Sequence, residues 1–337
     1  MDAAREMIAT TDNWQGYCRT CGYLLRGLQT SRCPECGKTF DRADPRTFRK
    51  KPKRPLKTWA QRAAVLLLLL ATTYAAEIGW LYWGWKIEQP AVAVGKSHGG
   101  VRTAAIGPTW LCKTLRPSDR WLLERVAAID LQTATTSDDD LAAVGQLHHL
   151  ETLAISSPHV TDQGLAHLAG LRQVRILLLH STRITDSGLV HLRNMRKLIF
   201  LSLSDTSVTG SGLVNLQGIS TLSAVDLCNT PLAPEFLREL RALPALQQLS
   251  LEITSTDDAA LVHLEMLSQL NSLSLVSTKI SDRGLKVLTR MKGLKMLHLD
   301  LNAVSPQAVT ELRTALPQTT VDADNLLPVH FDLDAAQ

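Results

Sequence analysis

Four cysteines near the N-terminus carry the clearest chemical signal in the sequence. Cys18 and Cys21 form one CxxC pair, Cys33 and Cys36 form a second, and eleven residues separate the two pairs. Each pair can offer two thiolates from one tight turn to a tetrahedral ion, so the spacing predicts a metal site with zinc as the default ion. Two disulfides or four free thiols are the less favoured alternative.

The residues around these cysteines predict a small zinc ribbon over residues 14–42. The pattern CGY followed by CPxCG also resembles the knuckles of rubredoxins, which implies redox-active iron as an alternative, but the spacer here is shorter and poor in aromatic residues. The only basic residues between the pairs are Arg26 and Arg32, and the only aromatic residue is Tyr23. These are few for a surface that stacks bases and binds phosphates. We expect a metal-dependent module that contacts protein, and nucleic acid is not the favoured partner.

No other group of residues in the sequence is suited to catalysis. Gly95-Lys-Ser97 resembles part of a phosphate-binding loop, but the motif needs glycine where this chain has Pro90. The sequence contains neither GxSxG nor HExxH. His167, His191 and His263 share one position of a repeat on its outer helical face, so periodicity explains them better than metal binding. We predict that the protein is not an enzyme.

A 24-residue repeat organises most of the remaining chain. Similar segments begin at Val160, Ile184, Val208 and Ile280: VTDQGLAHLAGL, ITDSGLVHLRNM, VTGSGLVNLQGI and ISDRGLKVLTRM. Eight units cover residues 126–317, and they start at Val126, Leu150, Val174, Leu198, Leu222, Leu246, Leu270 and Leu294. A period of this length is the mark of a solenoid and decides the fold before any local propensity does.

Each unit is predicted to form a short strand followed by a short helix. In residues 198–203, alternation puts Leu201 and Leu203 inward and Phe200 outward. In the second half of a unit, Leu189, Leu192 and their equivalents recur every three residues, which predicts one buried face of a helix.

Two further positions of the unit support this assignment. The twelfth position can cap a helix in seven of eight units, and it holds Ser137, Thr161, Thr185, Thr209, Ala233, Asp257, Ser281 and Ser305. The ninth position is threonine in five consecutive units: Thr182, Thr206, Thr230, Thr254 and Thr278. We interpret these threonines as a structural ladder that bonds backbone groups at the turn, without a catalytic role. Gly164, Gly188, Gly212 and Gly284, three residues after the cap, are expected to allow close approach of neighbouring helices.

These residues resemble the leucine-rich repeat family, nearest to the subclass found in F-box-type proteins, whose cysteine at the ninth position is threonine here. The resemblance covers about 190 of the 337 residues. It implies an α/β solenoid in which a curved parallel sheet lines a concave face and short helices lie on the convex side. It does not imply a ligand.

The concave face is where such proteins usually bind partners, and positions three, five and seven of each unit should line it. Most of these residues are small or polar, such as Thr152, Ser202 and Ser274. Against this background Ile176, Leu178 and Phe200 are expected to form an apolar contact patch for a protein or peptide, unless neighbouring side chains cover it. The predicted contact set is completed by the polar residues His180, Asp226 and Glu252.

A single membrane span is predicted over residues 63–85. This 23-residue segment is long enough for a bilayer, which needs about 20 apolar residues. Trp80, Tyr82, Trp83 and Trp85 resemble an interfacial belt at its far end. Glu77 interrupts the run, and we expect it to reach the interface rather than to pair inside the membrane.

Charge predicts the orientation of the span. A basic juxtamembrane arm is predicted over residues 43–62. Counted from Arg42 to Arg62, the segment before the span contains nine Lys or Arg and one acid, whereas residues 86–106 contain three basic residues. The N-terminus should therefore stay on the cytoplasmic side of a bacterial inner membrane, with the repeats on the outer side. This puts the metal-binding thiols on the reducing side. The net charge of +4 averages this basic arm with a neutral-to-acidic exterior.

The remaining segments are predicted from composition. Residues 86–109 are expected to be a linker, residues 110–125 the N-terminal cap of the solenoid, and residues 318–337 a C-terminal cap with an acidic tail. Cys112 and Cys228 lie in separate regions, and the sequence does not determine whether they pair.

The function predicted from these features is that of a single-pass membrane protein whose leucine-rich repeats bind protein or peptide without catalysis. The alternative is a membrane-tethered signalling or transcription regulator whose cytoplasmic ribbon binds nucleic acid or a regulatory protein. Salt-dependent binding of DNA to the N-terminal segment would favour the alternative.

Overall fold

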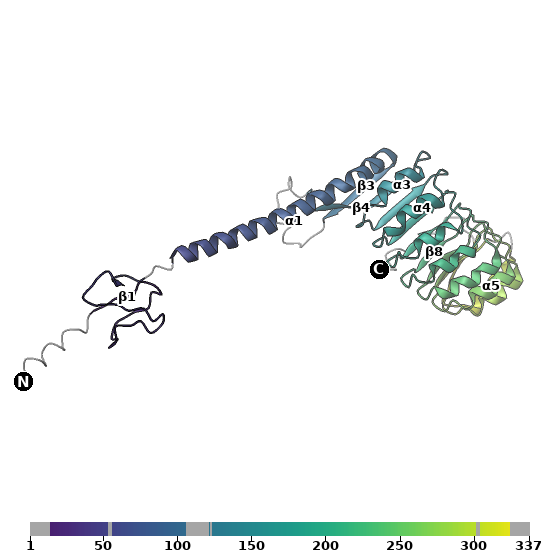
Figure 1. The fold of residues 1–337 in the computed structure, drawn as a ribbon. Helices are drawn as coiled ribbons and strands as arrows, with labels where there is room; N and C mark the ends of the chain where they lie inside the picture. The colour runs from purple at the N-terminus through teal and green to yellow at the C-terminus, as the bar shows by residue number, and fades with distance from the viewer. Residues whose placement is uncertain (1–13, 53–55, 106–120, 122, 301–303, 324–337) are drawn as a thin grey trace, which may run out of the picture. The chain divides into compact units, whose positions relative to one another are not determined.

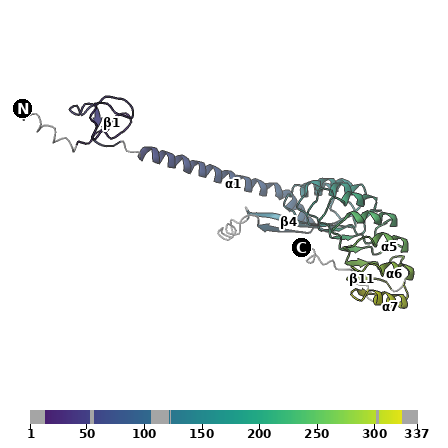
Figure 2. The ribbon, with the colours of Figure 1, turned by 90° about the horizontal axis from the view of Figure 1, so that it is seen from below.

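The architecture was obtained as a computed structural model of the whole chain, which describes residues 14–52, 56–105, 121, 123–300 and 304–323. The chain divides into two compact units, Met1–Glu77 and Ile78–Gln337, and each is described by itself. Figure 1 shows the ribbon of both units and Figure 2 shows it from below.

The first unit contains a small ribbon that is larger than the sequence predicted. Strand β1 (Tyr17–Cys18) pairs antiparallel with β2 (Phe48–Arg49), so the ribbon extends to Arg49 and not to residue 42. Phe48 is buried, and its ring lies 4.9 Å from that of Trp14 in an edge-on contact. The physical reason is that a module this small needs every aromatic side chain it has to build a core. The first residues of the predicted basic arm therefore belong to the ribbon.

Helix α1 (Leu56–His98) contains the predicted span and is longer than expected. Its residues 62–98 are long and apolar enough to cross a membrane, by length and composition, with a mean hydropathy of 1.7 over the best window. The six apolar side chains from Val65 to Leu70 are each 58–68% exposed. A helix that is apolar on all sides and unburied is unstable in water and suited to lipid.

The second unit is built on one ten-stranded sheet. The strands, in spatial as well as sequence order, are β3 (Gly100–Ala105), β4 (Glu124–Leu131), β5 (Thr152–Ser156), β6 (Ile176–His180), β7 (Phe200–Ser202), β8 (Ala224–Asp226), β9 (Gln248–Ser250), β10 (Ser272–Ser274), β11 (Met296–His298) and β12 (Thr320–Asp322). From β4 to β12 all neighbours are parallel, and paired residues differ by 24 in number, as Thr152, Ile176 and Phe200 do. The period of the sequence is therefore the register of the sheet.

Helices follow the strands and lie together on one side of the sheet (Figures 1 and 2). The α-helices are α3 (Asp138–Val144), α4 (Asp162–His167), α5 (Asp258–Leu264), α6 (Asp282–Leu288) and α7 (Pro306–Ala315). The 3-10 helices are η3 (Leu168–Gly170), η4 (Gly188–Leu192), η5 (Ser211–Leu216) and η6 (Pro234–Ala242). Packed helices need about 8–10 Å between axes and paired strands only about 4.8 Å, so the helical side must be the outer, convex one. This is the architecture of a leucine-rich repeat solenoid.

The capping residues predicted from the sequence begin five of the helices and miss two. Thr161, Asp257 and Ser281 each accept a hydrogen bond from a backbone N–H of the helix that they cap. The 3-10 helices η4 and η5 instead begin two or three residues after the expected caps, at Gly188 and Ser211. The ninth-position threonines bond the backbone as expected, since the hydroxyls of four of them donate to a carbonyl three residues earlier at 2.6–2.7 Å.

The segment 86–109 is not a linker where the structure describes it, so that expectation was wrong. Helix α1 runs through Pro90 to His98, and β3 then pairs antiparallel with β4. An interior proline costs a helix about 3 kcal/mol, but burial outweighs this cost because Ala91 is fully buried against the first repeat and Glu88 accepts the N–H of Val126 at 3.1 Å. Helix and strand together cover the open edge at β4. The cap predicted at residues 110–125 falls mostly outside the described residues, as does the tail 324–337.

A ladder of aspartates links consecutive repeats. Asp162 Oδ1 accepts the backbone N–H of Thr185 at 2.8 Å, and its Oδ2 accepts the Thr185 hydroxyl at 2.6 Å. The same pair of bonds joins four further aspartates to the cap position of the next unit: Asp138, Asp186, Asp258 and Asp282. Gly164, three residues after the cap Thr161, leaves room for its rung, because a Cβ there would collide with the Asp138 carboxylate.

Removal of one rung should measurably weaken the solenoid. We expect Asp162→Ala to lower the free energy of unfolding by about 1–3 kcal/mol, because the partly buried backbone N–H of Thr185 loses the carboxylate that accepts its hydrogen bond. Urea denaturation of the purified chain, followed by circular dichroism, measures the change. Gln163→Ala, at the exposed neighbouring position, is the control, and equal destabilisation by both variants would contradict the role given to the ladder.

Candidate metal centre and concave face

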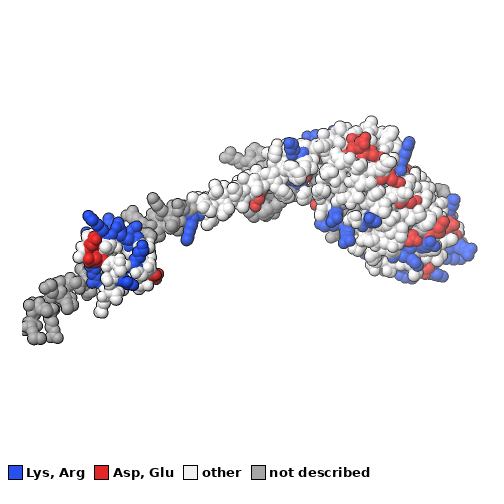
Figure 3. Space-filling view, viewed as in Figure 1, with Lys and Arg blue, Asp and Glu red and all other residues white. Residues whose placement is uncertain are grey.

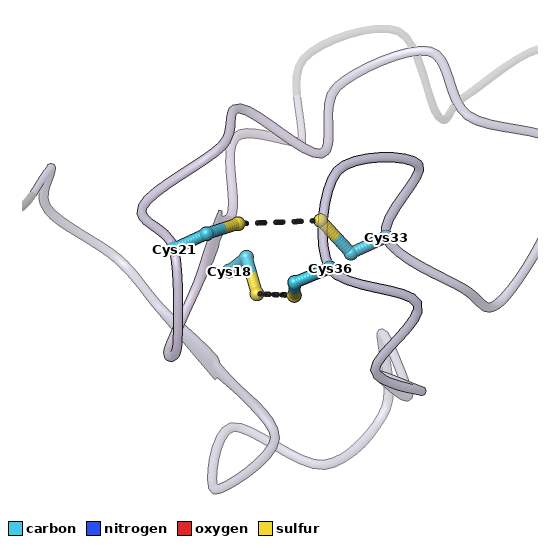
Figure 4. A group of neighbouring side chains, drawn as sticks. All are labelled: Cys18, Cys21, Cys33 and Cys36. Atoms are coloured by element: carbon cyan, nitrogen blue, oxygen red, sulfur yellow. Dashed lines mark hydrogen bonds between the residues drawn. The ribbon is translucent and has the colours of Figure 1, made fainter.

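The four predicted metal ligands lie together in the ribbon. Their sulfur atoms all lie within 4.8 Å of one another, and Figure 4 shows the two facing pairs, Cys18 with Cys36 at 3.4 Å and Cys21 with Cys33 at 3.5 Å. A disulfide would require about 2.05 Å, and all four cysteines are free thiols. Zinc–sulfur bonds of about 2.3 Å in a tetrahedron require sulfur atoms about 3.8 Å apart. The donor set therefore fits a tetrahedral zinc or iron ion.

Two matching turns position the sulfurs. The backbone N–H of Gly22 donates to the carbonyl of Cys18, and that of Gly37 donates to the carbonyl of Cys33. Both glycines have positive φ, at 85° and 69°, a conformation that other residues adopt at a cost. Each CxxCG segment thus folds as a knuckle that turns both of its sulfurs to the same side.

The pKa values of two of these thiols are shifted in opposite directions when no cation is bound. Burial raises the pKa of Cys18, but backbone hydrogen bonds from Cys21 and Thr20 and two neighbouring thiols lower it, to about 6. A backbone hydrogen bond from Tyr23 lowers the pKa of Cys21, while loss of solvation and the three other sulfurs raise it, to about 12. The Cys18 thiolate therefore forms readily, the neighbouring sulfurs oppose that of Cys21, and a positive ion among the sulfurs would favour the thiolate form.

The concave face contains the second group of predicted site residues. Ile176 and Phe200 are direct register partners on β6 and β7, and Leu178 pairs with Ser202. Ile176, Leu178 and His180 are half-buried, but Phe200 is only 6% exposed. Strand neighbours lie about 4.8 Å away on both sides of each concave residue, so a large side chain in the middle of the face is enclosed. Phe200 is thus part of the packed surface, and the exposed apolar area is smaller than the sequence suggested.

A polar network lies beside the apolar residues, and sequence reasoning missed it. Asp226 accepts hydrogen bonds from the hydroxyls of Ser202, at 2.8 Å, and of Ser204. His180 Nδ1 lies 3.3 Å from the same Ser202 hydroxyl, and Glu252 accepts the hydroxyl of Ser274 in the next part of the face. The signal was available, because these residues recur at the fifth and seventh positions of successive units.

This network is not a nucleophilic triad. In such a triad the carboxylate orients the histidine and the histidine takes the proton of the serine. Here Ser202 lies between His180 and Asp226 and is fully buried. The arrangement holds these side chains in place on the concave face. The Ser202 hydroxyl donates to the Asp226 carboxylate, and not to a histidine that could accept its proton during attack on a substrate.

Cys228 is the concave cysteine, and its chemistry is suppressed. Burial raises the pKa of its thiol, and the nearby carboxylates of Asp226, Glu252 and Asp205 raise it further, to about 12. Cys112 lies outside the described residues. The neutral Cys228 thiol is a packing group at physiological pH.

The solved structures that are similar to this chain are internalins and another leucine-rich repeat protein, and the similarity is low. No protein-family model and no curated protein matches the chain. Among solved structures, internalin C2 of Listeria monocytogenes is 23% identical over 55% of this chain and 73% of its own, with a TM-score of 0.38. A leucine-rich repeat protein of Leptospira interrogans is 19% identical over 54% of this chain and 50% of its own, with a TM-score of 0.40. A second Listeria internalin is 17% identical over 56% and 71%, with a TM-score of 0.33. At these scores the assignment of the fold rests on the strand register described above.

The cysteine cluster should bind one metal ion per chain. We expect the protein purified without chelators to contain about one equivalent of zinc and Cys33→Ser to lose it, because three sulfurs leave a position of the tetrahedron open. Elemental analysis measures the metal, and Cys228→Ser is the matched control that should retain it. Wild-type protein whose intact mass shows two disulfides and no bound metal would contradict the site.

The thiol of Cys228 should react slowly with alkylating agents. With a pKa of about 12, only about one ten-thousandth of it is thiolate at pH 8, compared with about a quarter for an exposed cysteine. We expect its carbamidomethylation by iodoacetamide to be about a thousandfold slower than that of glutathione and to increase steadily up to pH 10. A rate that levels off near pH 9 would contradict the raised pKa.

Proposed function

We propose that this chain is a single-pass membrane protein whose leucine-rich repeats bind a protein or peptide on the concave face, without catalysis. The observation that carries the proposal is the regular, uninterrupted sheet from β4 to β12, which presents one side-chain row per position to a single partner surface. Nothing in the described network around Ser202 suits bond chemistry, whereas a fixed surface of polar and apolar groups suits recognition by complementarity.

The proposed contact region is centred on β6. Ile176 and Leu178 offer apolar area, and His180 stands at the end of the same strand. Further along the face, Asp226 and Glu252 add negative charge held in place by serine hydroxyls. A small apolar centre with an ordered polar border is the usual composition of a protein-binding site. The partner we propose therefore presents an apolar side chain to β6 and hydrogen-bond donors or basic groups to β8 and β9.

The proposed membrane anchor is the apolar part of helix α1, residues 63–85. Its support is the exposed stretch from Val65 to Leu70 and the aromatic residues Trp80 and Trp83, which are 63% and 62% exposed. With basic residues concentrated before the span, the proposed location is the bacterial inner membrane with a cytoplasmic ribbon and extracytoplasmic repeats.

The ribbon is proposed to be a zinc site with a structural role, with rubredoxin-like iron as the alternative ion. Its support is the set of four sulfurs around one centre and a hydrophobic core of only a few side chains, including Leu25 and Phe40. A metal that closes two knuckles supplies the stability that such a core cannot.

One observation favours the second candidate function, regulation through the ribbon. Residues 14–52 carry nine Lys or Arg against three acids, and Figure 3 shows basic side chains over much of the visible ribbon surface. A basic surface of this kind would also suit nucleic acid. Binding of DNA that weakens linearly with the logarithm of salt concentration would favour this candidate over a purely structural ribbon.

Crosslinking in cells tests the binding site. A photo-reactive amino acid at Leu178 should capture a specific protein, because this side chain is half-buried at the proposed centre. Val214, 47% exposed on the convex side, is the matched control position. Mass spectrometry identifies the products, and identical products from both positions would argue against a concave binding site.

Reporter fusions test the anchor and its orientation. Alkaline phosphatase fused after Gln337 should be active and a fluorescent protein at the same point should be dark, since the repeats are proposed to be outside. The reverse pattern would invert the proposed orientation. Release of the full chain by alkaline carbonate would exclude a membrane span altogether.

A further inference from the structure

The solenoid has two long edges that differ in their relation to helix α1. We call the turns before the strands the leading edge, which comprises residues 145–151, 169–175, 193–199, 217–223, 241–247, 265–271 and 289–295. The turns after the strands form the trailing edge, which comprises residues 132–138, 156–162, 180–186, 204–210, 228–234, 252–258 and 276–282. All strands from β4 to β11 are parallel. The leading edge therefore lies along the N-terminal ends of the strands, and the trailing edge lies along their C-terminal ends.

Within the second unit, helix α1 runs in the same direction as β4. Arg125, at the start of β4, donates from Nη2 to the carbonyl of Leu81 at 2.8 Å and forms a buried ion pair with Glu88 at 3.6 Å. At the other end, His98 Nδ1 lies 2.7 Å from the Thr133 hydroxyl, just after β4 ends. The residues of α1 nearest the proposed membrane are therefore on the side of the leading edge, and His98 is on the side of the trailing edge.

Aromatic residues mark the level at which this helix would leave the membrane. Trp80, Tyr82 and Trp83 are 63%, 47% and 62% exposed, and they lie within one turn of Leu81. Tryptophan and tyrosine gather where a membrane meets water. Tyr82 and Trp85 also contact Trp121, whose rings lie 6.5 and 5.0 Å away. The interfacial level is thus tied to the start of β4, and with it to the leading edge.

Charge divides sharply between the two edges. The leading edge has nine basic residues and two acidic ones, Glu151 and Glu265. The nine are Arg172, Arg175, Arg193, Arg196, Lys197, Arg241, Arg290, Lys292 and Lys295. The trailing edge has two basic residues, Arg183 and Lys279, and eight acidic ones. In Figure 3 a row of acidic side chains follows the repeats; one group of basic side chains lies apart from it, and others lie beside its far end.

The fold explains the acidic edge but not the basic one. Five of the eight acids of the trailing edge belong to the aspartate ladder, which caps the next unit. By contrast, eight of the nine basic side chains of the leading edge are exposed, and Arg175 is half-buried. Arg290 pairs with Glu265 at 3.3 Å, and Lys197 donates to Gln173 at 2.6 Å, both on the surface. Surface contacts of this kind contribute little stability, so these residues have no packing reason to be basic.

We infer that the leading edge binds the anionic headgroups of the membrane in which α1 is anchored. The inference rests on the proposed membrane span and adds a second contact to it. Basic residues near an anionic bilayer are attracted within a screening length of about 8 Å, and each one multiplies binding by about five. The trailing edge is repelled by the same surface. The bilayer contact therefore holds the strands pointing away from the membrane and keeps the concave face open to the side.

Lipid crosslinking in nanodiscs tests the contact on the full chain. A phospholipid with a photo-reactive headgroup is included in discs of phosphatidylcholine alone or of phosphatidylcholine with phosphatidylglycerol. We expect labelled peptides from residues 193–199 and 289–295, with about fivefold or greater yield in the anionic discs, and no labelling of residues 180–186. Labelling that is equal in both discs, or that falls on the trailing edge, would overturn the inference.

Charge reversal supplies the matched comparison. The triple variant R193E/R196E/K197E should lose most of the leading-edge labelling. The variant K279E/R283E/K286E makes the same change in charge at exposed residues away from that edge and should label as the wild type does. Equal labelling of both variants would overturn the inference. Carbonate extraction is performed first on every sample: a chain that is not retained in membranes refutes the anchor itself, whereas a retained chain with an unlabelled edge refutes only the headgroup contact.

Discussion

The stacking of each repeat on the next is the interaction on which the rest of this structure depends. A single 24-residue unit has one short strand and one short helix, and alone it would leave its leucines exposed. Pairing at a constant offset of 24 residues aligns Leu153, Leu177, Leu201 and their equivalents into continuous buried rows. The aspartate ladder joins units across this offset, and the ninth-position threonines fix the turn within each unit.

The same stacking creates a problem at its first edge, and helix α1 solves it. An open strand edge and the apolar face beside β4 would be exposed to water. Strand β3 pairs with that edge, and the second half of α1 buries Ala91 against it, with Glu88 and Arg125 as a buried ion pair. The second half of α1 thus serves as the cap of the solenoid, in the same helix that contains the apolar segment.

The ribbon obeys a different constraint. Its core consists of a few side chains around Leu25 and Phe48, and four sulfurs converge on one point that suits a tetrahedral cation. The repeats are stabilised by their neighbours and the ribbon is proposed to be stabilised by an ion, so the two parts of the chain would gain their stability independently. The functions proposed for them are likewise separable.

The sequence by itself determined the features that depend on spacing: the 24-residue register, the strand and helix halves of each unit, and the convergence of Cys18, Cys21, Cys33 and Cys36. Spacing is sufficient there because each contact repeats or lies within a short turn. Only the tertiary structure decided that α1 continues through Pro90, that the ribbon extends to Arg49, and that Phe200 is enclosed. Each of these depends on burial against residues distant in sequence, which local propensity does not encode. The division of charge between the edges became visible for the same reason, since the parallel strands bring turns from seven units into line.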